Sequence, residues 1–124
     1  MHWLAWLAIA DGCLAVCAHF SRKIGYYRRL LHFGVCALFA STVTLLALPA
    51  LWAIGKRASG NWLAGRAFYY STLVMLGISV EIEGEELLDK ASPCVLVGNH
   101  QTMFDLIMLG RVFPKQTVIL AKRA

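Results

Sequence analysis

The chain has 124 residues, of which 59% are hydrophobic and 15% charged, and its mean hydropathy is +0.62. This composition argues against an ordinary water-soluble domain and favours a protein that lies in or on a membrane. The formal net charge of +5 favours an anionic partner. Because the basic residues lie beside apolar segments and not between aromatics that could stack on bases, anionic membrane lipid fits better than nucleic acid.

The first apolar run extends from Trp3 to Phe20, and it admits three interpretations. It can be a spanning helix, a tilted or half-inserted helix, or a signal peptide with a small-residue cleavage site at Val16-Cys17-Ala18. No Lys or Arg precedes it, which argues against the signal peptide. Asp11 near its middle makes full insertion costly, so the first two interpretations stay open.

The second apolar run, from Leu30 to Ile54, has no charged side chain. Its first part, to Leu48, matches the roughly 20 residues that a bilayer core requires. Pro49 removes one helical hydrogen bond and crowds a carbonyl, so a helix should kink or end near it. This run is the firmest prediction of a membrane span.

The basic residues on the two sides of the second run are nearly balanced. Four precede it in "SRKIGYYRR", and three follow it as Lys56, Arg57 and Arg66. Since the excess of positive charge sets the orientation of membrane helices, this count leaves the topology open. We assign residues 1–58 to membrane-anchoring helices.

The four cysteines form no CxxC pair, and three of them lie inside apolar runs, where a thiol behaves as a small hydrophobe. The pattern predicts neither a zinc site nor a disulfide framework. From Asn61, which can cap a helix, an aromatic segment runs to a stop near Gly77. This helix can lie on the membrane surface or serve as a core helix of the domain that follows.

The remaining sequence predicts alternating strands and helices. "SVEIEG" has the period-2 alternation of a half-buried strand, "GEELLDKASP" turns the chain, and "CVLV" and "TVILA" are short apolar runs typical of buried strands. Between them, "FDLIMLG" predicts a short helix closed by Gly110. Strand, helix and strand at this spacing predict a βαβ unit, so residues 59–124 are expected to begin an α/β domain with a parallel sheet.

One stretch, "GNHQTMFD", places a histidine and a carboxylate close together. If "CVLV" is a strand, Asn99 and His100 occupy the loop at its carboxyl end, where open α/β sheets bind their ligands. The alternative is structural, because Thr102 followed by Asp105 resembles a capping box at the start of a helix. Capping explains Asp105 but not His100.

The wider segment "VGNHQTMFDLIMLGRVFP" resembles the NHxxxxD region of the glycerolipid acyltransferases, and most closely the fungal-type 1-acyl-sn-glycerol-3-phosphate acyltransferases. The resemblance covers Cys94 to Lys122. It implies an enzyme that transfers an acyl group from acyl-CoA to the sn-2 hydroxyl of lysophosphatidic acid, forming phosphatidic acid. It implies no metal or prosthetic group, and it implies the endoplasmic reticulum as the site in a eukaryotic cell.

The resemblance also implies roles for individual residues. His100 would be the general base, and Asp105 would orient its imidazole and stabilise the cation. Asn99 would shape the loop, with direct contact to the substrate as the weaker alternative. Lys122 would meet phosphate or CoA, although an ordinary solvated lysine is an equal alternative. An imidazole that titrates near pH 6.5 suits the removal of a proton from an alcohol.

One part of the family pattern is missing from these residues. Related enzymes carry an E-G-T-R segment whose arginine is thought to hold the acceptor's phosphate. Here no glutamate follows Glu86, and only Arg111 and Arg123 follow Asp105. We therefore expect the amino-terminal part of an acyltransferase, inactive alone. The alternatives are an acyltransferase for glycerol-3-phosphate or another lysophospholipid, and a truncated non-catalytic membrane protein.

Overall fold

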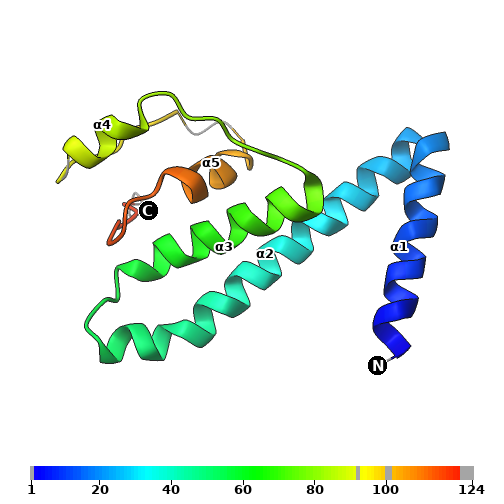
Figure 1. The fold of residues 1–124 in the computed structure, drawn as a ribbon, viewed down its shortest axis with the longest axis horizontal. Coiled ribbons are helices and arrows are strands. Elements are labelled where there is room, and N and C mark those ends of the chain that lie inside the picture. Colours follow the sequence, from blue (N-terminus) through cyan, green and yellow to red (C-terminus); the bar gives the residue numbers. More distant parts are fainter. Residues whose placement is uncertain (1, 92, 100–101, 121–124) are drawn as a thin grey trace, which may run out of the picture. The chain divides into compact units, whose positions relative to one another are not determined.

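The computed structural model describes residues 2–91, 93–99 and 102–120, and all regular secondary structure in this part of the chain is helical (Figure 1). The chain divides into two compact units between Val35 and Cys36, inside the second helix. The helices are α1 (His2–Phe20), α2 (Arg22–Ala53), α3 (Ser59–Leu76), α4 (Glu85–Lys90) and α5 (Asp105–Val112).

The first unit contains α1 and the beginning of α2, joined by a polar contact. The Nε and Nη2 atoms of Arg28 donate hydrogen bonds of 2.9 Å each to the two carboxylate oxygens of Asp11. Nε2 of His32 lies 2.9 Å from Oδ1 of the same carboxylate. The acidic side chain that makes α1 costly to insert is therefore paired, and polar groups paired in this way are tolerated at membrane depth.

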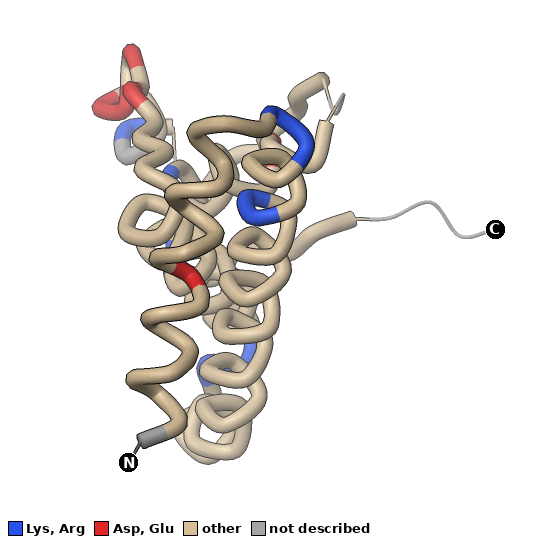
Figure 2. Tube along the Cα trace, turned by 90° about the vertical axis from the view of Figure 1, so that its right-hand side faces the viewer, with Lys and Arg blue, Asp and Glu red and all other residues tan. Residues whose placement is uncertain are grey.

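Helices α1 and α2 are both long and apolar enough to cross a membrane, judged by length and composition. Their large apolar side chains point outward in the structure, with Trp6 69% and Leu46 78% exposed. Figure 2 colours Lys and Arg blue and Asp and Glu red, and it leaves α2 tan from Leu30 to Ala53. Pro49 lies inside α2, which ends four residues later. An uncharged, outward-facing apolar surface is what contact with lipid requires.

The second unit is built around α3. Its buried side chains come from the second part of α2, from α3 and from α5 with the residue after it: Cys36, Ala40, Phe68, Tyr69, Thr72, Ile107 and Phe113. The predicted stop at Gly77 is confirmed, since its φ of 66° is left-handed and its N–H bonds to the carbonyl of Leu73. The predicted capping by Asn61 is wrong, because α3 already begins at Ser59 and Asn61 lies within its first turn.

Helices α3 and α5 lie side by side (Figure 1) and touch backbone to backbone at two glycines. A Cβ atom added to Gly110 would stand 2.2 Å from the carbonyl oxygen of Gly65, far inside van der Waals contact. Only a residue without a side chain fits there. The prediction that Gly110 closes its helix is therefore wrong: the glycine sits inside α5, which continues to Val112.

The predicted α/β class with a βαβ unit is also wrong for the described residues. The segments 78–84, 93–99 and 114–120 are not helical, and in the described part of the chain no backbone hydrogen bond joins one to another. The apolar side chains expected inside a sheet are exposed, with Val97 at 92% and Leu120 at 87%. The predicted turn "GEELLDKASP" contains the short helix α4. Alternation favours an extended backbone, but a strand exists only when a neighbour pairs with it.

Candidate active site

Asp105 is the first residue of α5, and the packing of this helix fixes its position. Ile107, only 1% exposed, turns into the core of the second unit, whereas Leu106 and Met108 face outward. Gly110 rests on the backbone of α3. One buried side chain and one glycine contact thus hold a helix of eight residues, and through it the carboxylate at its start.

The carboxylate of Asp105 serves the turn that begins its own helix. The backbone N–H of Thr102 donates to Oδ2 of Asp105 at 3.0 Å, and the hydroxyl of Thr102 lies 3.5 Å from Oδ1. The N–H of Asp105 in turn bonds to the carbonyl of Thr102 at 3.2 Å. This is the capping arrangement that the sequence offered as an alternative. A carboxylate accepts several hydrogen bonds, so capping is compatible with a second bond to an imidazole N–H.

The other residues of the predicted site are only partly described. His100 and Lys122 lie outside the described residues, so their roles stay predictions. Asn99 is described and exposed, at the end of the segment 93–99, whose residues are all exposed. Asn99 and Asp105 are thus the members of the predicted site that the structure describes.

A second polar contact holds α5 from its other end. The guanidinium of Arg111 donates two hydrogen bonds to the carboxylate of Glu85 in α4, that from Nη2 to Oε2 measuring 2.7 Å. These bonds, with the charges of Arg111 and Arg66, hold the pKa of Glu85 below its ordinary value against the opposing effect of burial. The hydrogen bonds to Glu85 also raise the pKa of Arg111. The sequence does not reveal this contact, because the partners lie 26 positions apart and no local pattern links them.

Two further cationic side chains lie beside Trp62 of α3, and the charge of one of them, Arg66, also lowers the pKa of Glu85. Cζ of Arg66 lies 5.9 Å and Nζ of Lys115 lies 5.5 Å from the centre of the indole ring. Both distances are within the range of cation–π attraction. We call Arg66, Arg111 and Lys115 the cationic cluster. From the sequence, Arg66 is one of the basic residues that bear on membrane topology, and no local pattern distinguishes Lys115.

Metal-binding side chains do not converge in this part of the chain. Within residues 2–91, 93–99 and 102–120, no three His, Cys, Asp or Glu side chains are grouped so that they could hold a metal ion. The cysteines are all free thiols, of which Cys36 is buried and the other three are exposed.

The segment around Asp105 is similar to a known protein family. Residues 79–124 match the Acyltransferase family. The chain is 41% identical over 71 residues to a 1-acyl-sn-glycerol-3-phosphate acyltransferase of Saccharomyces cerevisiae, covering 57% of this chain and 23% of that protein. It is 31% identical over 117 residues to the human 1-acyl-sn-glycerol-3-phosphate acyltransferase beta, covering 94% of this chain and 41% of the relative. The acyltransferase resemblance of "GNHQTMFD" is thereby confirmed.

The chain spans less than half the length of these relatives. A mouse 1-acyl-sn-glycerol-3-phosphate acyltransferase alpha is also much longer than the matched region: the identity is 28%, and the match covers 83% of this chain but 35% of the relative. No solved structure matches the chain. The similarity to the human protein extends through the apolar helices, whereas the family match begins at residue 79.

Proposed function

We propose that the protein transfers an acyl group from acyl-CoA to the sn-2 hydroxyl of 1-acyl-sn-glycerol-3-phosphate, which yields phosphatidic acid and free CoA. The observation that carries the proposal is the acyltransferase match over residues 79–124, which includes His100 and Asp105. The named relatives are 1-acyl-sn-glycerol-3-phosphate acyltransferases. The position of Asp105 at the start of a packed helix supports its assignment to the site.

In this proposal His100 removes the proton from the sn-2 hydroxyl as its oxygen attacks the thioester carbonyl. An alcohol is a poor nucleophile near neutral pH, and a neutral imidazole can accept its proton there. The tetrahedral intermediate then expels the CoA thiolate, which takes up a proton to become the free thiol. Asp105 accepts a hydrogen bond from the other imidazole nitrogen and stabilises the cation that forms.

The remaining site residues have supporting roles in the proposal. Asn99 shapes the loop that carries the base, and Lys122 meets a phosphate of either substrate. We also assign the protein to a membrane of the endoplasmic reticulum when its source is eukaryotic. Helices α1 and α2, long and apolar enough to cross a bilayer, support a membrane setting that suits a lipid acceptor.

The direct test measures phosphatidic acid formed from lysophosphatidic acid and radiolabelled acyl-CoA. One arm uses membranes that contain the chain, which we expect to be inactive alone, and a second uses the yeast relative with its matched segment replaced by residues 79–124 of this chain. We expect the hybrid to retain acyl transfer and His100→Ala in it to abolish transfer. The matched control in the same hybrid is Glu86→Gln, in α4 and outside the predicted site.

The choice of acceptor distinguishes the proposed enzyme from an acyltransferase for glycerol-3-phosphate or for another lysophospholipid. Glycerol-3-phosphate and lysophosphatidylcholine are offered in place of lysophosphatidic acid in the same assay. Preference for either would reassign the acceptor but keep the reaction class. Near-normal turnover by the His100→Ala hybrid would refute the proposed base.

A further inference from the structure

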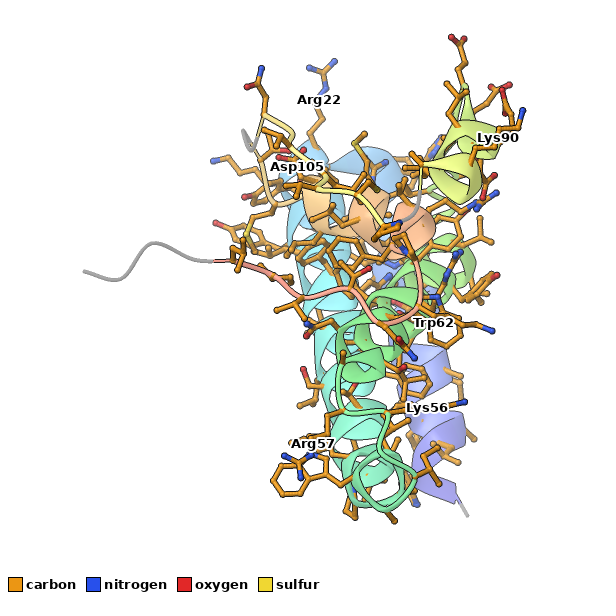
Figure 3. All side chains as sticks on the ribbon, turned by 90° about the vertical axis from the view of Figure 1, so that its left-hand side faces the viewer. Arg22, Lys56, Arg57, Trp62, Lys90 and Asp105 are labelled. Atoms are coloured by element: carbon orange, nitrogen blue, oxygen red, sulfur yellow. The ribbon has the colours of Figure 1, made fainter. Side chains whose placement is uncertain are left out.

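The cationic cluster holds more positive charge than the carboxylate beside it can neutralise. Arg66 and Lys115 lie beside Trp62, which Figure 3 labels on α3, and Arg111 is paired with Glu85. Glu85 binds Arg111 through both of its oxygens and also feels the charge of Arg66. Among the described side chains, these three cations against one carboxylate leave an excess of two positive charges.

The fold brings these cations together through contacts that are independent of their charge. Arg66 and Arg111 each follow one of the two glycines at which α3 and α5 touch, so the glycine contact places the two arginines close to each other. The turn that carries Lys115 is also held. The side-chain amide of Asn61 donates to the carbonyl of Thr117 at 3.2 Å, and the hydroxyl of Thr117 bonds to the carbonyl of Pro114 at 2.7 Å.

Arg66 lacks an acceptor for one of its donors. Its Nε atom is buried and has no hydrogen-bond partner in the described part of the chain. A buried donor left unpaired costs free energy, and native proteins rarely leave one without a partner. The negative end of the α5 dipole favours cations near the C-terminus of that helix, which explains the positions of Arg111 and Lys115. It does not explain the position of Arg66, which belongs to α3.

A phosphate supplies what the cluster lacks. Its oxygens accept several hydrogen bonds at once, a planar guanidinium meets two of them side by side, and a lysine adds a point charge. Its negative charge matches the excess of the cluster. A neutral ligand would satisfy the Nε donor but would leave the charge excess in place.

We infer that Arg66, Arg111 and Lys115 form a phosphate-binding site near Trp62 and Glu85, at the end of α5 away from Asp105. The identity of the ligand rests on the proposed function, because both substrates of that reaction carry phosphate: the phosphomonoester of the acceptor and the phosphates of CoA. Arg111 lies six residues after Asp105 on α5, roughly 9 Å along the helix axis at 1.5 Å per residue. The site therefore binds the substrate at a distance from the reacting atoms.

The test measures binding and not turnover, so it can fail or succeed independently of the proposed reaction. The whole chain in neutral detergent micelles is titrated calorimetrically with coenzyme A and with lysophosphatidic acid, and lysophosphatidylcholine serves as the zwitterionic comparison. The variants are Arg66→Gln and Lys115→Gln. The matched control is Arg57→Gln, because Arg57 also stands over an indole, 4.4 Å from the ring centre of Trp52, but outside the cluster.

We expect both cluster variants to bind one of the two phosphate ligands about tenfold more weakly, the effect of losing one charge-assisted hydrogen bond, and the control to bind as the unsubstituted chain does. Weaker binding of coenzyme A assigns the site to the acyl donor, and weaker binding of lysophosphatidic acid assigns it to the acceptor. Unchanged affinities, or an equal loss in Arg57→Gln, would overturn the inference. Phosphatidylglycerol vesicles are titrated in a separate arm, and a loss of binding seen only with them would also overturn the inference, because the cluster would then contact the membrane surface.

Discussion

The carboxylate of Asp105, at the start of α5, has two roles in this account: it caps the turn at Thr102, and in the proposed mechanism it orients the imidazole of His100. The variant Asp105→Asn separates them, since the amide oxygen can still accept the N–H of Thr102 whereas the negative charge is lost. We expect the helix to persist and acyl transfer in the hybrid enzyme to fall by about 10²-fold or more, the usual worth of acid–base assistance. Turnover and far-ultraviolet circular dichroism measure the two effects. Thr102→Ala is the control, because it removes the hydroxyl and keeps the backbone donor.

The pair formed by Glu85 and Arg111 makes the attachment of α5 depend on pH. Because the hydrogen bonds from Arg111 hold the pKa of Glu85 below its ordinary value of 4.5, the pair stabilises the folded state above that pH. Stability is lost as the pH falls through the lowered pKa. We expect hydrogen-exchange protection of the α5 amides to decline below about pH 4.5, and Glu85→Gln to remove this dependence. Glu86→Gln, one residue along α4, should leave the profile unchanged.

The crossing of α3 and α5 depends on two residues without side chains. In Gly110→Ala the new Cβ would stand 2.2 Å from the carbonyl oxygen of Gly65, so the helices must separate. We expect a loss of about 1–3 kcal/mol in the free energy of unfolding, the usual cost of overpacking. In Gly34→Ala, within α2, the new Cβ has no neighbouring atom within 4 Å, so this substitution should stabilise the helix by up to about 1 kcal/mol. Thermal unfolding followed by circular dichroism compares them, and equal effects would contradict this account of the crossing.

Local patterns predicted the presence of α1, α2, α3 and α5, but they missed α4 and two helix ends and predicted strands that the described residues do not form. The charge-free run from Leu30, the stop at Gly77 and the short helix that carries Asp105 depend on nearby residues, and all three are present. The strand predictions depended on pairing between distant segments, which periodicity does not encode. The role of Gly110 was missed for the same reason, because its partner Gly65 lies 45 residues earlier in the chain and only the tertiary structure brings them together.

The same distinction between local and distant information applies to the site. The motif around His100 and Asp105 is contiguous, so it was visible in the sequence and agrees with the family match over residues 79–124. The cationic cluster draws on α3, α5 and the turn that follows, and it follows from the glycine crossing and not from any run of residues. The pairing of Asp11 is a second example of distant information. Its carboxylate looks costly to insert when α1 is considered alone, but it is paired with Arg28 and His32 of the next helix.

For the whole molecule, the decisive question is whether α2 is embedded in a bilayer. Its uncharged run and outward-facing leucines predict that the chain stays in the membrane pellet after washing with alkaline carbonate, which removes peripheral proteins. Leu45→Arg combined with Leu46→Arg places two charges on exposed positions of this run, each costing roughly 2.5–3.5 kcal/mol for insertion at the helix centre. We expect that variant to appear largely in the supernatant. Leu87→Arg, at an equally exposed apolar position of α4, should remain in the pellet. Release of the unsubstituted chain would show that α2 does not span, and the outward-facing leucines would then need a protein partner instead of lipid.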